Sequence, residues 1–146
     1  MKRSQSRETA FLVIFEKSFH DEPIEVLLEN AREIGEIQIN EFAEKLIATT
    51  FQHVELIDEK IKQYSIKWKI NRLSKVALAI LRLALCEIDY YEDIPISVSI
   101  NEAVELAKKF ASPDDASFIN GLLGAYVKDL PTENEEPKSK ESVHPN

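Results

Sequence analysis

The stretch from Val76 to Ile88 is the feature that most constrains the fold. Its apolar residues recur at helical spacing and cover almost the whole circumference of the helix, and only Arg82 and Glu87 interrupt them. A helix that is apolar on nearly every side must be surrounded by other elements. The stretch is also too short to span a bilayer. The sequence therefore predicts a non-membrane protein that packs around one central helix.

Five further segments carry apolar residues three and four positions apart, which is the spacing of one helix face. The first runs from about Gln5 to Phe19 behind a basic leader. The second runs from Asp21 to Gly35, with proline near its start and glycine at its end. A long third helix with a continuous buried seam is predicted from Ala43 to Tyr64, and two more follow Pro95 and Ser112. No segment alternates like a strand, so the predicted fold is all-α.

These helices divide into two groups along the chain. We expect residues 1–64 to form an N-terminal subdomain with the basic leader, and residues 65–130 to form a C-terminal subdomain of about three helices. After Pro131 the composition changes to proline, glutamate, lysine and serine, with Val143 as the one aliphatic residue. Such a segment cannot bury enough apolar surface to order itself. Residues 131–146 are therefore predicted to be a disordered tail.

The charge is unevenly distributed. The formal net charge of -8 argues against nucleic-acid binding if only the total is considered. However, the first seven residues carry Lys2, Arg3 and Arg7 and no acid, and the stretch from Lys60 to Cys86 holds seven basic residues and no acid. Both patches are candidates to meet phosphate despite the acidic total. The alternative is that these side chains merely solvate helix surfaces.

Residues for catalysis or metal binding are not grouped in this sequence. His20, His53, His144 and Cys86 are scattered without the spacing of zinc ligands, so we expect no metal and no cofactor. Cys86 falls in the most apolar helix, where a thiol usually fills the core. We therefore expect no catalytic residue and no enzyme. A single cysteine and the absence of a secretory pattern favour a cytoplasmic protein.

Three stretches resemble the NusB family, and the resemblance extends from about Lys2 to Leu130. The most specific stretch comprises Ile94-Pro95, the run VSINEAVELAK from Val98 to Lys108, and FINGLL from Phe118 to Leu123. The second is ILRLAL from Ile80 to Leu85 with Glu87, together with Trp68 and Arg72 ahead of it. The third is the N-terminal Arg7, Glu8 and Ala10.

The resemblance implies a fold of two small three-helix subdomains packed together, and a function in transcription antitermination. Members of the family pair with ribosomal protein NusE, bind the boxA element of nascent ribosomal RNA, and help the RNA polymerase antitermination complex to resist termination. No covalent chemistry is involved.

The resemblance also implies positions for the binding residues. The expected RNA contacts are Lys2, Arg3, Arg7, Phe118 and Asn120, and Phe15 is expected near the NusE surface. Basic side chains hold phosphates, whereas aromatic and amide groups read unstacked bases of a single strand.

Each of these positions has a structural alternative. Phe15 and Phe118 fall near apolar stripes and are also candidates for the core, and Asn120 is a candidate for an internal hydrogen bond. Arg82, inside an apolar helix, is expected to pair with a buried carboxylate or a backbone group. The sequence departs from the family at Leu12, Phe15 and Ala77, where glutamine, tyrosine and an acid are usual. The competing function is a helical homodimer that binds a partner protein and has little or no affinity for RNA.

Overall fold

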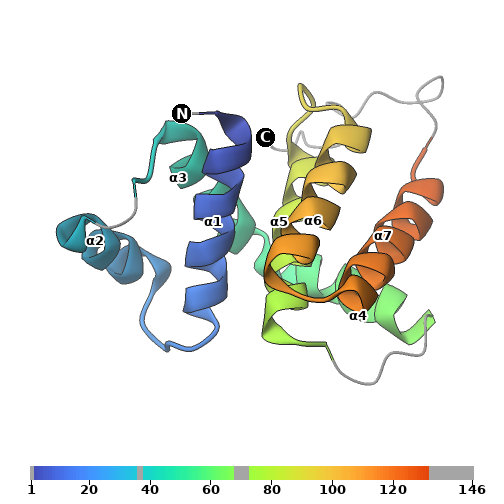
Figure 1. The fold of residues 1–146 in the computed structure, drawn as a ribbon, viewed down its shortest axis with the longest axis horizontal. Coiled ribbons are helices and arrows are strands. Elements are labelled where there is room, and N and C mark those ends of the chain that lie inside the picture. Colours follow the sequence, from blue (N-terminus) through green and yellow to red (C-terminus); the bar gives the residue numbers. More distant parts are fainter. Residues whose placement is uncertain (1, 36–37, 68–72, 132–146) are drawn as a thin grey trace.

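The computed structural model describes residues 2–35, 38–67 and 73–131, and within them the chain forms seven α-helices and no strand (Figure 1). The all-α prediction is confirmed. Trp68, Arg72 and the predicted disorder after Pro131 lie outside the described residues. The helices are α1 (Arg3–Lys17), α2 (Ile24–Ile34), α3 (Glu41–Gln52), α4 (Val54–Lys67), α5 (Lys75–Tyr90), α6 (Ile96–Phe110) and α7 (Pro113–Lys128).

Helix α5 lies at the centre of the molecule, as its sequence predicts. It begins after Ser74, whose Oγ accepts a hydrogen bond from the backbone N–H of Ala77 at 3.0 Å. Ten of its sixteen residues are buried, and it packs against α1, α3, α4, α6 and α7. A helix that is apolar on all sides needs neighbours on all sides, and these five helices supply them.

The other helices flank α5 on two sides. Helices α1 and α3 pack together on one side, with α2 against α1, while α6 and α7 pair on the other side (Figure 1). Helix α2 buries only Leu28 and ends at Gly35, which has a φ of 77°. Ser112 caps α7, because its Oγ accepts from the N–H of Asp115 at 3.0 Å.

The prediction of one continuous helix from Ala43 to Tyr64 is wrong, because the chain bends at His53. This residue has φ -115° and ψ 19°, and it separates α3 from α4. Its ring stacks on Tyr90 of α5, with 4.0 Å between centroids. The apolar spacing continues across the bend because both helices bury one face. Helix α3 buries its face against α1 and α5, whereas α4 packs against α5 and α7. The division of the chain into residues 1–64 and 65–130 stays a prediction.

Candidate nucleic-acid interface

Two exposed basic residues, Lys2 and Arg3, stand at the start of α1. The helix begins at Arg3, so the expectation that the basic residues precede the first helix is wrong for Arg3 and Arg7. The backbone N–H of Lys2 donates to Gln5 Oε1 at 3.1 Å, and the carbonyl of Lys2 accepts from the N–H of Ser6 at 3.0 Å. The leader is therefore folded into the first helical turn.

This helix end combines two sources of positive potential. The first backbone N–H groups of a helix lack intrahelical partners and carry a partial positive charge, which favours bound anions. Lys2 and Arg3 add two full charges there. The side chain of Arg3 is 54% exposed and its Nη2 lies 3.7 Å from Asp93 Oδ2. The end of α1 is thus suited to hold phosphate, with one acid nearby.

Arg7 is placed differently, since its side chain is buried between its own helix α1 and the helices α5 and α6. Its Nε donates to Glu87 Oε2 at 2.6 Å, and the two side chains are only 5% and 2% exposed. The other oxygen of Glu87 accepts from Ser99 Oγ at 2.8 Å. Glu102 Oε1 lies 3.8 Å from Arg7 Nη1. The RNA contact expected for Arg7 stays a prediction that its burial disfavours, and a positioning role suits its geometry better.

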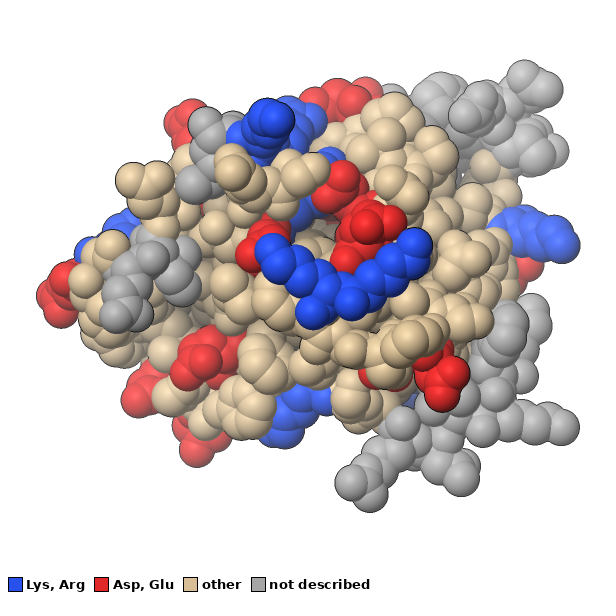
Figure 2. Space-filling model, in the orientation of Figure 1, with Lys and Arg blue, Asp and Glu red and all other residues tan. Residues whose placement is uncertain are grey.

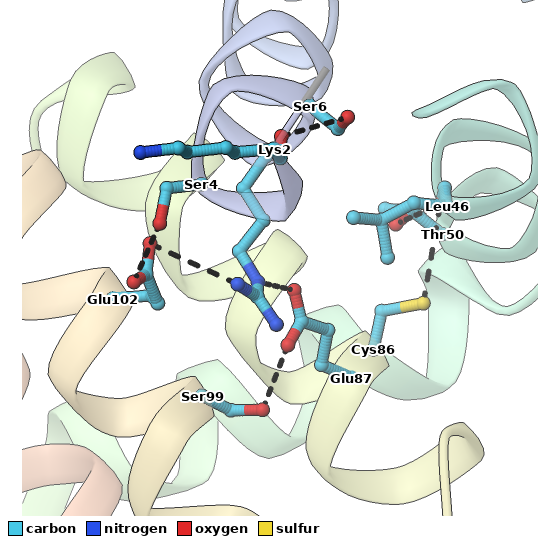
Figure 3. Close-up of polar contacts among 10 residues, drawn as sticks. Lys2, Ser4, Ser6, Leu46, Thr50, Cys86, Glu87, Ser99 and Glu102 are labelled. Carbon is cyan, nitrogen blue, oxygen red and sulfur yellow. Dashed lines mark hydrogen bonds and ion pairs between the residues drawn. The ribbon is translucent and has the colours of Figure 1, made fainter. Parts of the chain in front are cut away.

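Further polar contacts join the first turns of α1 to its neighbours. Ser4 Oγ donates to Glu102 Oε2 at 3.0 Å, a contact that Figure 3 shows. Asn40, which caps α3, donates through Nδ2 to Ser6 Oγ at 2.8 Å. The backbone that carries Lys2 and Arg3 is therefore fixed against α3 and α6. This network is the part of the site that sequence reasoning missed, since its partners are distant in the chain.

Phe118 and Asn120 lie on α7. Phe118 is half-buried and packs against the core, which supports its alternative role as a core residue. Asn120 is exposed and lines an open groove between α6 and α7, together with Asn101, Ser117 and Lys108. Helix α6 lies between this groove and the basic end of α1, since its other side receives Ser4 of α1. The structure thus places Asn120 and the basic end of α1 on opposite sides of α6.

Phe15 lies far from Lys2, near the other end of α1. Phe15 lies twelve positions after Arg3 in α1, which corresponds to about 18 Å along the axis. Phe15 is half-buried between Phe11 and Phe19, with ring centroids 5.9 and 5.1 Å away. Phe19 follows the helix, is 55% exposed, and carries Lys75 Nζ 4.7 Å from its ring centroid. The expected partner surface is therefore separate from the basic end of α1.

The structure describes four basic side chains of the second patch, of which Lys60, Lys75 and Arg82 have polar partners and Lys62 is exposed. Lys60 Nζ donates to Asp89 Oδ2 at 2.6 Å, and Arg82 forms two hydrogen bonds of 2.8 Å to Asp58. Arg82 thus pairs with a carboxylate as expected, although the Asp58 side chain is 40% exposed rather than buried. Lys75 donates to the carbonyl of Ser18 at 2.9 Å. Lys60, Lys75 and Arg82 are therefore less available to phosphate than the exposed residues at the end of α1.

The face seen in Figure 2 carries basic and acidic side chains side by side at its centre, over the junction of α1 and α6. Lys109 Nζ lies 2.8 Å from Glu8 Oε1, and Lys108 Nζ lies 3.4 Å from Glu105 Oε2. A phosphate chain that crosses this junction meets lysines that are already paired with acids. The electrostatics therefore favour binding at the start of α1, where Lys2 is exposed.

Three observations bear on other kinds of site. Among the residues that the structure describes, no three His, Cys, Asp or Glu side chains come close enough together to hold a metal ion. Burial raises the pKa of Cys86 to about 12, which keeps it a neutral thiol. In the same described part of the chain, every helix is too short or too polar to cross a membrane.

Comparisons with known proteins agree with this architecture. The model of the NusB family matches residues 4–128. The transcription antitermination protein NusB of Thermoanaerobacter sp. (strain X514) is 41% identical over 130 residues, which span 88% of this chain and 92% of that protein.

Solved structures match as well. A chain in the crystal structure of the antitermination factors NusB and NusE in complex with dsRNA has a TM-score of 0.77 and 30% identity, and the match covers 88% of this chain and 97% of that one. T. maritima NusB has a TM-score of 0.78 and 31% identity, over 92% and 96% of the two chains. Sequence and fold together establish that this chain belongs to the NusB family of transcription antitermination proteins.

Proposed function

We propose that this protein binds boxA-type RNA together with ribosomal protein NusE and thereby helps RNA polymerase to resist termination. The observation that carries the proposal is the likeness to a chain of the NusB–NusE–dsRNA structure, with a TM-score of 0.77 over 88% of this chain. The exposed basic end of α1 supports it, because that end offers two cations and a helix N-terminus to phosphate. The protein acts in the cytoplasm as a binding factor and not as an enzyme.

The residues divide the work of binding. Lys2 and Arg3 hold phosphates, and Asn120 contacts bases of a single strand along the groove between α6 and α7. The half-buried Phe118 contacts a base from α7, outside the residues that line this groove. Arg7 positions the end of α1 through its ion pair with Glu87. Phe15 belongs to the NusE surface, with the exposed Phe19 beside it.

A titration of labelled boxA-like RNA, followed by fluorescence anisotropy with and without NusE at two salt concentrations, tests the proposal. The double variant Lys2→Ala/Arg3→Ala should bind more weakly and keep its helical circular dichroism spectrum. Each lost contact to single-strand phosphate should reduce the salt slope by about 0.7, so the double variant should lose roughly 1.4. Binding by the double variant with the wild-type affinity and slope would contradict the assignment of these residues.

The partner surface needs a separate measurement. Phe15→Ala should weaken binding of NusE in the absence of RNA, since packed aromatic anchors carry much of the energy of protein interfaces. Leu56→Ala is the matched control, because Leu56 is an exposed apolar residue on α4. If neither RNA nor NusE binds to the wild type, the remaining candidate is a homodimer that binds another protein. Sedimentation equilibrium would then decide that alternative.

A further inference from the structure

Two cations and two aromatic rings meet where α1, α3 and the end of α5 come together. The Cζ of Arg3 lies 4.6 Å from the ring centroid of Phe42, and Lys45 Nζ lies 5.8 Å from the ring centroid of Tyr91. The two rings contact each other edge to face, with 6.1 Å between centroids. We call Arg3, Phe42, Lys45 and Tyr91 the cation–aromatic strip. It continues the basic end of α1 onto α3.

The cations of the strip face solvent, and its aromatic rings lie beneath them. Arg3 and Lys45 are exposed, Phe42 is half-buried and Tyr91 is buried. Phe42 and Lys45 are three residues apart in α3, so they share one face of that helix. A cation that already rests on an aromatic ring has less conformational freedom to lose when a ligand arrives. The two cations are therefore partly preorganised for an anionic ligand.

The chemistry of the strip suits a single-stranded nucleic acid. Proteins bind single strands by combining cations that follow the phosphates with flat groups on which bases stack. The guanidinium plane of arginine serves as such a flat group, and lysine serves as a point charge. A duplex keeps its bases stacked inside, so it can use only the charges.

Acids near the strip limit its attraction for phosphate. Asp93 Oδ2 lies 3.7 Å from Arg3 Nη2, and both side chains are largely exposed. Glu44 of α3 is already paired, because its Oε1 lies 2.9 Å from Arg32 Nη2. Asp93 is therefore the carboxylate that competes most directly with a phosphate for Arg3.

We propose that the cation–aromatic strip is an additional RNA-binding surface, which takes single-stranded RNA with a base stacked on the guanidinium plane of Arg3, a phosphate at the N–H edge of the same guanidinium, and the next phosphate at Lys45. Phe42 is a positioning residue that holds Arg3 in place. This inference rests on the proposed function and extends its RNA surface to α3, which the sequence did not indicate.

The test is an anisotropy titration of the full chain with NusE and a labelled single-stranded boxA-like RNA. Arg3→Lys keeps the charge and loses the stacking plane, so affinity should fall with an unchanged salt slope. Phe42→Leu should lower affinity about five-fold or more, and Phe42→Tyr should retain it. Lys45→Ala should reduce the salt slope by about 0.7. Asp93→Asn should raise affinity about two-fold or more, because it removes the exposed carboxylate that competes with phosphate for Arg3.

The control is Lys128→Ala, which removes an exposed lysine from the end of α7, away from α3 (Figure 1). Thermal melts verify that each variant is folded at the titration temperature. If Phe42→Leu is unfolded, the affinity of Arg3→Lys decides whether the strip binds RNA. If wild-type protein binds the RNA and the strip variants bind like Lys128→Ala, the strip is not an RNA surface although the proposed function stands. If wild-type protein does not bind the RNA, both proposals are overturned.

Discussion

Arg7→Ala should destabilise the fold far more than its place in a basic N-terminal segment indicates. The substitution removes the cation that faces Glu87 and leaves a carboxylate that is 2% exposed. Ser99 Oγ remains as a hydrogen-bond donor to Glu87, but it carries no charge. Loss of one partner from a buried ion pair costs about 3–5 kcal/mol, because the other charge stays desolvated. That is a large fraction of a typical stability of about 5–15 kcal/mol.

Urea denaturation followed by circular dichroism measures this effect. A loss of about 3–5 kcal/mol corresponds to a fall in Tm of roughly 6–20 °C for a protein of this size. Arg3→Ala is the matched control, since Arg3 lies one turn earlier in α1 with its side chain 54% exposed. An exposed ion pair contributes about 0–1 kcal/mol, so the control should remain close to wild type.

A double variant separates the ion pair from the space it fills. Arg7→Met/Glu87→Leu replaces both charges by apolar groups, and such replacements are often neutral. It should therefore recover most of the stability that Arg7→Ala loses. The reasoning is refuted if Arg7→Ala and Arg3→Ala lower the free energy of unfolding equally. That result would mean that Glu87 is not desolvated in solution.

Three other measurements test separate features. The tyrosinate absorbance of the native protein should stay low near pH 10, because the hydrogen bond to Asp129 and burial raise the pKa of Tyr64 to about 12, and burial raises the pKa of Tyr90, Tyr91 and Tyr126. Because the fold favours the protonated phenols, their contribution to stability is complete below about pH 10 and is lost as the pH rises through about 12. Ionisation of the tyrosines at about pH 10 without loss of structure would contradict the raised pKa values. Cys86 should not react with a thiol reagent at about pH 8 until the protein unfolds, and rapid labelling of the native protein would show that its burial is wrong. Gly35→Ala should lower the free energy of unfolding by about 1–2 kcal/mol through backbone strain alone, because Gly35 has φ 77° and open space around it. An unchanged urea midpoint would argue against that backbone conformation.

The helices could be predicted from local spacing, whereas the bend at His53 could not. The apolar positions of α3 and α4 keep a helical period across the bend, and period alone does not reveal that the two helices pack against different neighbours. His53 is held by its stacking on Tyr90, which lies 37 positions later in the chain. A contact of that kind leaves no trace in the spacing around residue 53.

The sequence around Arg7 indicates that this residue is buried, but it does not indicate that Glu87 is its partner. Arg7 stands three, four and seven residues before Ala10, Phe11 and Ile14, so it lies on the same buried face of α1. Glu87 likewise interrupts an apolar helix. Two opposite charges on two buried faces predict a pair, but nothing local indicates which residues meet. The exposure of Lys2 and Arg3, by contrast, agrees with the run of polar residues that follows them up to Thr9.

The contacts that fix the start of α1 also bear on how the chain folds during its synthesis. Ser4, Arg7 and Glu8 emerge from the ribosome before their partners Glu102, Glu87 and Lys109, which follow 98, 80 and 101 residues later. At about 5–20 residues per second, α1 waits roughly 4–20 s for these partners. During that interval the face that carries Phe11 and Ile14 has no finished core to cover it. Among the seven described helices, nascent α1 is therefore the one that a chaperone at the ribosomal exit has the longest time to bind.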